Sequence, residues 1–231
     1  MPERRAAVQA VIYLVFNEGY TATAGDALIR RELCAEAIRL GRVLCAIDRQ
    51  DPEGLGLLAL MLLHDSRRQA RVDTAGGLVI LEEQDRSLWD RAQIDEGLGL
   101  VDAALRMGRV GPYQLQAAIA ALHAEAASSD DTDWRQIAAL YGVLARIQPS
   151  PVVQLNGAVA IGMSEGPDRG LALIDELGRE LDRYHLFHAA RADMLRRLGS
   201  FEAAADAYRR ALALMANGVE RAYLERRLAA L

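Results

Sequence analysis

The chain has 231 residues, which is long enough to bury a full-sized core. Hydrophobic residues make up 52% of it and aromatic residues only 5%, so the composition favours helices packed through small side chains over a sheet protein. The net charge of −5 repels a phosphate backbone, and direct binding of DNA or RNA by this chain is therefore disfavoured. Every basic residue is an arginine, which leaves bidentate recognition of carboxylates available at many positions.

Two cysteines and the hydropathy pattern indicate the cellular compartment. Cys34 and Cys45 fall in one predicted helix, with Cα atoms about 16 Å apart at the helical rise, so they cannot form a disulfide with each other. The sequence has neither a signal-peptide pattern nor an apolar run long enough to span a bilayer. We therefore expect a cytoplasmic, reduced protein without membrane association.

The first part of the chain predicts three helices. Residues 5–18 carry apolar side chains at helical spacing, and Gly19 follows as a residue that can adopt the left-handed cap conformation. A second helix is expected over residues 25–46. A third is expected to begin at Pro52, which suits a first turn, and to continue toward Arg71.

An irregular segment and two more helices follow. Residues 72–85 interrupt the helical pattern, and the short β-branched run within them is too brief for a sheet of its own, so we expect an ordered crossover. A fourth helix is expected from Leu88 to Gly108, and a fifth opens at Pro112.

The second half predicts paired helices. Thr132 is a candidate N-cap for the next helix, beside Asp133, whose charge complements the helix dipole. Residues 150–182 form a pair divided at Gly166, and residues 184–216 form the most regular repeat. A polar helix over residues 217–231 is expected to cap the stack.

The regular repeat has the spacing of a tetratricopeptide repeat (TPR). With Gly199 as the turn residue, small and large apolar side chains fall at the offsets where such a repeat packs its two helices: Ala192, Leu195, Ala204, Tyr208, Ala211, Leu212 and Leu214. One repeat cannot bury its own apolar faces, so neighbouring repeats are required.

Three motifs have a chemical and a structural interpretation. Residues 162–166 match a G-x-S-x-G nucleophile elbow at Ser164, but a serine hydrolase needs a sheet that this sequence does not predict, so a turn at a helix end is favoured. His185 and His188 share a helix face and could begin a metal site, although no further ligand motif supports it. A hydrogen-bonded core histidine at position 188 is the favoured alternative, and no metal is predicted. Gly-x-Gly at 54–56 and 97–99 lacks the strand and third glycine of a dinucleotide fingerprint, so close helix contacts are expected there.

A set of further motifs resembles a known family. The chain is similar to the C-terminal extension of one group of extracytoplasmic-function (ECF) sigma factors at residues 13–20, 33–40, 56–63, 84–86 with Trp89, 111–121, 132–134, 149–153 and 188–193. The resemblance covers nearly the whole chain. One departure is at residues 155–158, which read Leu-Asn-Gly-Ala where the group has Leu-Asn-Arg-Ala, so no arginine role transfers to Gly157.

This resemblance implies a bacterial transcription-initiation protein in which sigma regions 2 and 4 precede a TPR-like extension. Those regions are missing here, so the chain is expected to be the C-terminal part of such a factor with a regulatory role. The resemblance also implies contacts with the sigma regions or RNA polymerase in place of a separate anti-sigma factor, and an association with a small YCII-related protein.

We therefore predict a single all-α domain over residues 1–231, a TPR-like right-handed superhelix of about eleven helices with a short irregular crossover near residues 72–85. The predicted function is a non-enzymatic, cofactor-free regulatory interaction domain; the alternative is a small-molecule or metal sensor, in which Arg86, Trp89 and Tyr113 would converge on a closed pocket. Polar and aromatic residues at helix ends are the candidates for partner or ligand binding: Asn17, Glu18, Tyr20, Gln84, Asp85, Arg86, Trp89, Tyr113, Gln114, Gln116, His188, Arg191 and Asp193.

Overall fold

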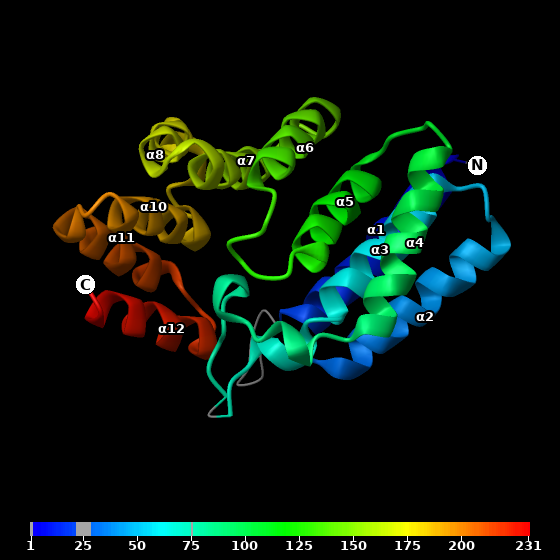
Figure 1. Ribbon diagram of the computed structural model, residues 1–231, viewed down its shortest axis with the longest axis horizontal. Coiled ribbons are helices and arrows are strands. Elements are labelled where there is room, and N and C mark those ends of the chain that lie inside the picture. The colour runs from blue at the N-terminus through cyan, green and yellow to red at the C-terminus, as the bar shows by residue number, and fades with distance from the viewer. Residues whose placement is uncertain (1, 22–28, 75) are drawn as a thin grey trace. The chain divides into compact units, whose positions relative to one another are not determined.

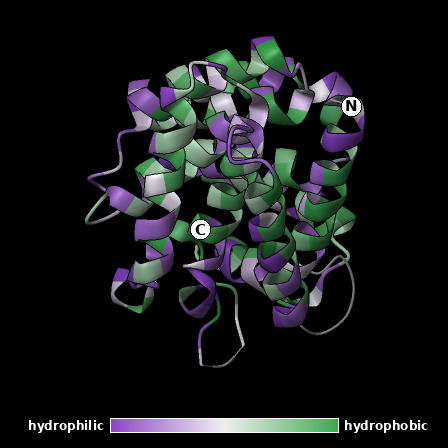
Figure 2. Ribbon diagram, turned by 90° about the vertical axis from the view of Figure 1, so that its right-hand side faces the viewer, coloured by the Kyte–Doolittle hydropathy of each residue, from purple (hydrophilic) through white to green (hydrophobic). Residues whose placement is uncertain are grey.

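The fold is all-α, as the composition and periodicity predicted (Figure 1). The computed structural model describes residues 2–21, 29–74 and 76–231, and within these ranges it has twelve α-helices and no β-strand. The only extended pairing in those ranges is an isolated antiparallel bridge between Val72 and Leu78, inside the predicted crossover. Hydrophobic and hydrophilic residues alternate along most helices, as buried helix faces require (Figure 2).

The chain divides into two compact units, an N-terminal unit of Met1–Thr132 and a C-terminal unit of Asp133–Leu231. The sequence had predicted one continuous array over residues 1–231. The helical pattern alone could not place this division, because amphipathic periodicity records that a helix packs but not which helices it packs against.

In the N-terminal unit, four helices surround a fifth. The central helix is α3 (Pro52–Asp65), and α1 (Pro2–Tyr20), α2 (Arg31–Ile47), α4 (Arg91–Arg106) and α5 (Pro112–Glu125) all pack against it. Nearly every residue of α3 is buried, from Leu55 through Leu63 without a break. A helix that is apolar all round is stable only when it is enclosed on every side, and this explains the arrangement.

Glycines permit the closest approaches within this unit. A Cβ at Gly56 would lie 2.7 Å from the backbone nitrogen of Gln114, and one at Gly97 would lie 2.8 Å from Cγ of Leu63. These two positions confirm the expected close helix contacts, whereas nothing lies within 4 Å of a Cβ at Gly99. Gly19 was predicted to be a left-handed cap, and this was wrong. It is helical, its φ is not positive, and it allows the backbone of Cys34 to approach α1.

Other helix boundaries in this unit also differ from the prediction. Positions 25–28 of the second predicted helix lie outside the described residues, and α2 begins at Arg31. α3 ends at Asp65 rather than near Arg71, because the chain tightens into the 3₁₀ helix η1 (Arg68–Arg71). α4 begins three residues later than predicted, since Asp90 caps it by accepting a hydrogen bond from the backbone nitrogen of Gln93 at 3.1 Å.

In the described part of the crossover between α3 and α4, residues 66–74 and 76–90, the chain forms short helical turns. After η1 the crossover contains η2 (Leu81–Glu83) and η3 (Arg86–Leu88), and Trp89 at its end is buried. Short 3₁₀ turns are frequent in segments that connect helices.

The C-terminal unit is a row of helices in which each packs against the next. It contains α6 (Trp134–Ile147), α7 (Pro151–Glu165), α8 (Pro167–Glu176), α9 (Gly178–Leu181), α10 (His185–Arg197), α11 (Phe201–Leu214) and α12 (Gly218–Ala229). Packing runs from α6 to α7, α8, α10, α11 and α12 in turn. This order is the one expected of stacked helical hairpins.

The most regular predicted repeat is the hairpin of α10 and α11. Gly199 turns the chain with a φ of +73°, and Ala192, Leu195, Ala204 and Tyr208 are buried in one cluster, as predicted. Thr132 was predicted to cap α6, and this was wrong. Asp133 is the N-cap, because its carboxylate accepts a hydrogen bond from the backbone nitrogen of Gln136 at 2.9 Å.

Candidate functional site

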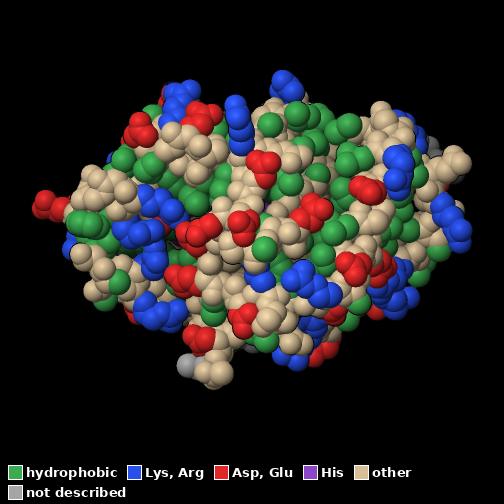
Figure 3. Space-filling view, in the orientation of Figure 1, with side chains coloured by type: hydrophobic (Ala, Val, Ile, Leu, Met, Phe, Trp, Pro, Cys, Tyr) green, Lys and Arg blue, Asp and Glu red, His purple; other side chains and the backbone are tan. Residues whose placement is uncertain are grey.

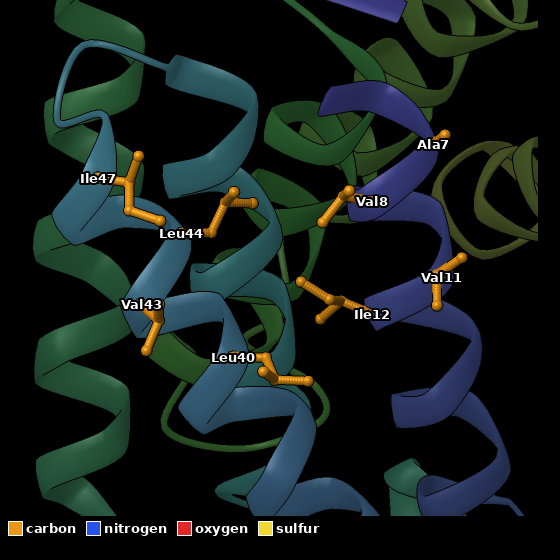
Figure 4. Close-up of a pocket in the computed structure, with 8 residues that line it drawn as sticks. All are labelled: Ala7, Val8, Val11, Ile12, Leu40, Val43, Leu44 and Ile47. Carbon is orange, nitrogen blue, oxygen red and sulfur yellow. The ribbon is translucent and has the colours of Figure 1, made fainter. Parts of the chain in front are cut away.

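An apolar groove lies between α1 and α2 in the N-terminal unit (Figure 4). Its volume is about 450 Å³, and all the side chains that line it are apolar: Ala7, Val8, Val11, Ile12, Leu40, Val43, Leu44 and Ile47. Val8 and Ile12 project from α1 toward α2, and Leu40 projects toward α1 (Figure 4). Ile47 is 78% exposed and Val11 is 60% exposed, which is unusual for such side chains gathered in one place.

The groove forms because both helices carry more apolar residues than the core can take. Ile12 and Phe16 of α1 and Ile38 of α2 face inward, in one cluster with Leu58 of α3. Val11, Val43 and Ile47 are left on the outer side. Arg5 and Asp48 form an ion pair at 2.7 Å between the N-terminal turn of α1 and the C-cap of α2.

A second site, rich in arginine and aromatic side chains, lies at the C-terminal end of α3. Nη2 of Arg67 donates to the Tyr20 hydroxyl at 2.9 Å and lies 3.1 Å from Nδ1 of His64. The guanidinium of Arg71 lies 3.6 Å from the centre of the Tyr20 ring and donates to the backbone oxygen of Tyr20. Burial, aided by both arginines, holds the pKa of His64 well below its usual range, so its imidazole is neutral and can accept the hydrogen bond from Arg67.

Arg86 and Trp89 belong to the same site. The guanidinium of Arg86 lies 4.7 Å from the centre of the Trp89 ring and donates at 2.6 Å to the backbone oxygens of His123 and Ala126, at the C-terminal end of α5. Burial and the charges of Arg67 and Arg86 lower the pKa of His123 to about 4. Arg86 therefore connects the crossover to the C-terminal end of α5, which is a structural role.

Next to this cluster is a polar pocket of about 410 Å³. It is lined by Arg31, Asp65, Ser66, Arg68, Gln69, Ser87, Leu88, Trp89, Asp90 and Gln93. Asp65 is only 3% exposed; its Oδ2 accepts hydrogen bonds from Arg68 and from Nε2 of Gln93, the latter at 3.1 Å. Its Oδ1, the indole nitrogen of Trp89 and Oε1 of Gln93 have no hydrogen-bond partner among the described residues.

The structure brings three of the predicted residues, Tyr20, Arg86 and Trp89, to the end of α3, but Tyr113 does not join them. Tyr113 lies at the start of α5, about 15 Å along the helix from His123, and packs edge-on against the Tyr13 ring at a centroid distance of 5.4 Å. The convergence of Arg86, Trp89 and Tyr113 that a sensor would require is therefore absent.

The remaining predicted residues of the N-terminal unit make local structural bonds. Asn17 hydrogen-bonds Tyr13, and Glu18 pairs with Arg30 at 3.3 Å. The other four bond backbone or neighbouring side chains: Gln84 donates to the Val79 oxygen, Asp85 accepts from the Ser87 nitrogen, Gln114 donates to Glu53 and to the Arg109 oxygen, and Gln116 donates to the Pro112 oxygen.

The three candidates in the C-terminal unit also have internal partners. His188 is buried, and its Nε2 lies 2.7 Å from the backbone oxygen of Asp182, so it is a hydrogen-bonded core histidine. Arg191 pairs with Asp175 at 2.7 Å. Asp193 binds Arg196 and Arg197 of its own helix and Arg227 of α12, a network whose hydrogen bonds lower its pKa against the opposing effect of burial.

Neither alternative chemistry finds support in the geometry. Ser164 lies in the last turn of α7, where its hydroxyl donates to the Ile161 oxygen at 3.3 Å, so residues 162–166 are not a strand-borne elbow. No group of three or more potential metal-ligating side chains occurs within the ranges that the structure describes. In the same ranges, no helix combines the length and hydropathy needed to cross a bilayer.

Sequence reasoning did not identify the groove, and of the residues that line the polar pocket it selected only Trp89 as a candidate. Val11 and Ile47 have the same helical spacing as core residues, and only packing shows that they are exposed. Asp65 stands at the end of an apolar run, and a charged residue there is a weak signal of a buried polar site.

Comparison with other proteins places these features in context. Residues 4–105, which include every residue that lines the groove and the polar pocket, match the family described as "Family of unknown function (DUF6596)". An uncharacterized protein of Rhizobium meliloti (strain 1021) is 50% identical over 226 residues, which cover 98% of this chain and 53% of that protein. The chain thus spans about half the length of the curated relative it matches.

Proposed function

We propose that this chain is a regulatory protein-interaction domain of an ECF-type sigma factor, and that its α1/α2 groove binds a helix of the sigma regions. The observation that carries the proposal is the groove itself, a continuous apolar surface exposed on the N-terminal unit. An exposed apolar patch bounded by charged residues is typical of a protein-binding site. The sequence resemblance supplies the identity of the partner.

The shape of the groove suits one short amphipathic helix. On α2 the lining residues fall at positions 40, 43, 44 and 47, so the apolar surface extends over about 10 Å, or two helical turns. A partner helix with apolar residues at i, i+3 or i+4 and i+7 would place two or three side chains between α1 and α2. Groups that must hydrogen-bond in order to be buried are absent from the lining, so an apolar face is the favoured occupant.

Two further facts bear on the kind of partner: the length of the relative and the charge of the chain. Nearly half of the Rhizobium relative lies outside the matched part, which leaves room for further domains of the size of the sigma regions. The net charge is −5, and on the surface of each unit that Figure 3 shows, arginines and acidic side chains are interspersed. The net charge and the distribution of charge favour a protein partner over nucleic acid for this part of the molecule.

The proposed domain would act in the cytoplasm without catalysis. It would hold sigma region 2 or region 4 in a position that raises or lowers promoter recognition by RNA polymerase. In this scheme the arginine–aromatic site at the end of α3 keeps α1, α3 and α5 together and supports the groove from within.

A binding experiment tests the proposal. The purified chain is titrated by calorimetry with sigma region 2, sigma region 4, core RNA polymerase and the YCII-related protein, each from the source organism. We expect one sigma region to bind, and the double variant Val11→Asp, Ile47→Asp to lose that binding. The matched control is Ile147→Asp, a change of an exposed apolar residue outside the groove.

The outcomes separate the candidates. Binding of only the polymerase or the YCII-related protein would replace the proposed partner, and binding of a sigma region that is unchanged in the double variant would remove the groove from the proposal. A transcription assay with the full sigma factor, with and without these residues, then determines whether the domain activates or inhibits. Equal transcription in both arms would contradict a regulatory role.

A further inference from the structure

We propose that the polar pocket at the C-terminal end of α3 binds a small zwitterion of the amino-acid class, with its ammonium group at Asp65 and Gln93 and its carboxylate near Arg31. This inference rests on the pocket alone and does not depend on the function proposed for the groove. The pocket and the groove have no lining residue in common.

The first argument comes from Asp65. Its carboxylate is almost fully buried, and one oxygen, Oδ2, already accepts hydrogen bonds from Arg68 and Gln93. The other oxygen, Oδ1, accepts none from the described residues. A buried carboxylate oxygen without a donor is unfavourable, and a ligand that donates a charged N–H would satisfy it.

The second argument comes from Gln93 and Trp89. Nε2 of Gln93 donates to Asp65, which assigns the orientation of the amide and makes Oε1 a second acceptor without a partner in the described chain. The indole nitrogen of Trp89 is a donor in the same situation, and the residue is only 3% exposed. A ligand that fits these atoms must donate to two acceptors and accept from one donor.

The third argument is the balance of charge. Two carboxylates, Asp65 and Asp90, and two guanidiniums, Arg31 and Arg68, line the pocket, so its lining has no net charge; Arg68 is paired with Asp65, and Arg31 has no such partner among the described residues. A simple cation would be attracted by the carboxylates and repelled by the guanidiniums, and a simple anion the reverse. A zwitterion can place its positive end near a carboxylate and its negative end near a guanidinium. Arg31 is exposed at the pocket and forms no ion pair with the described residues, which suits the carboxylate end.

The size of the pocket is compatible with this class. A volume of about 410 Å³ lies within the range of small-molecule sites and exceeds that of a bound water or a metal ion. The end of α3 also contributes through its orientation, because the partial negative charge at a helix C-terminus favours an ammonium group near Asp65.

The test uses the whole 231-residue chain and two independent readouts. The chain has two tryptophans, so the variant Trp134→Phe leaves Trp89 as the only one, and its fluorescence reports on the pocket. Free L-amino acids are titrated one by one against this variant, and heats of binding are measured on the unmodified chain. L-alanine, ethylamine and propionate form a matched set, because ethylamine lacks the carboxylate of alanine and propionate lacks its amino group. Each amino acid that binds is compared in the same way with the amine that lacks its carboxylate and the acid that lacks its amino group.

We expect at least one L-amino acid to bind saturably and to change the emission of Trp89, with the corresponding amine and acid at least about tenfold weaker. Asp65→Asn should weaken binding about tenfold or more, and Gln93→Met, which keeps the length of the side chain, should weaken it several-fold. The control is Gln136→Met, a change of an exposed residue of α6, for which no change in binding is expected. Circular dichroism confirms that each variant is folded, and Gln93→Met remains informative if Asp65→Asn is not.

Three results would overturn the inference. They are the absence of binding by every free amino acid, binding of the amine or the acid as tight as that of the zwitterion, and binding that Gln93→Met and Asp65→Asn leave unchanged.

Discussion

The groove between α1 and α2 leads to a quantitative prediction for the substitution Ile47→Ala. This change removes three carbons from a side chain that is 78% exposed in the free chain. At about 0.8 kcal/mol per buried methylene, a partner that covers the exposed part would lose about 2 kcal/mol, or about thirtyfold in the dissociation constant. The same calculation for Val11→Ala, with two carbons at 60% exposure, gives about 1 kcal/mol, or about fivefold.

The stability of the free chain should respond differently. Because Ile47 is already in contact with solvent, its truncation should change the free energy of unfolding by no more than about 0.5 kcal/mol. A loss of binding without a loss of stability is therefore the expected signature. It would distinguish a docking residue from a core residue such as Phe16, whose truncation would reduce both.

The assay measures both quantities on the same proteins. Dissociation constants for the sigma region that binds are obtained by isothermal titration calorimetry, and free energies of unfolding by urea titration followed by circular dichroism. Ile147→Ala is the matched control, because Ile147 is 45% exposed on α6, outside the groove. The reasoning is refuted if Ile47→Ala binds like the unchanged chain, or if Ile147→Ala weakens binding as much.

Three further predictions concern packing and titration. Gly170→Ala should lower the free energy of unfolding by about 1–3 kcal/mol, because the added Cβ would lie 2.6 Å from Cα of Gly162. Gly142→Ala is the control: no atom lies within 4 Å of its added Cβ on α6, so it should stabilise the chain slightly. Equal effects of the two changes in urea unfolding would contradict this prediction. The pKa of His123 is lowered to about 4, so between pH 6.5 and 4 the unfolded chain binds a proton at this residue that the folded chain does not. The free energy of unfolding should therefore fall as the pH decreases through this window, by up to about 1.4 kcal/mol per pH unit, and His123→Phe should reduce this pH dependence. A midpoint near pH 6.5 in an NMR titration of His123 would refute the lowered pKa. Burial raises the pKa of the Cys34 and Cys45 thiols to about 11, so at pH 8 iodoacetamide should alkylate these thiols more slowly than it alkylates free cysteine. The rate of alkylation should increase toward pH 11. A rate at pH 8 equal to that of free cysteine would show that the pKa values of the two thiols are not raised.

The sequence was most informative where the evidence is local. The hairpin of α10 and α11 was predicted from a turn glycine and the spacing of small and large apolar residues, and both were confirmed. The start of α3 at Pro52 was also predicted correctly, because proline at a first turn depends on backbone geometry within a few residues. The end of the same helix was not, since Ser66 and Arg67 bond to the last turn and tighten it in a way that spacing does not record.

The candidate site shows the limit of this reasoning. Tyr20, Arg86 and Trp89 were selected because polar and aromatic residues at helix ends often have functional roles, but the residue that connects Tyr20 to Trp89 is Arg67, which was not among the selected candidates. Arg67 and Tyr20 are separated by 47 positions in the sequence. Without knowledge of which helices are neighbours, no spacing rule can join them.

The amino-acid sequence by itself determined the all-α class, most helices and the hairpin turns of this protein, because helix periodicity, caps and glycine turns act over a few residues. Tertiary structure alone decided that α3 lies at the centre of its unit, that Val11 and Ile47 are exposed while Ile12 is buried, and that Asp65, Trp89 and Gln93 line one pocket. The physical reason is that burial and unsatisfied hydrogen bonds are properties of neighbours in space, and helices of equal amphipathic pattern can be packed in more than one order.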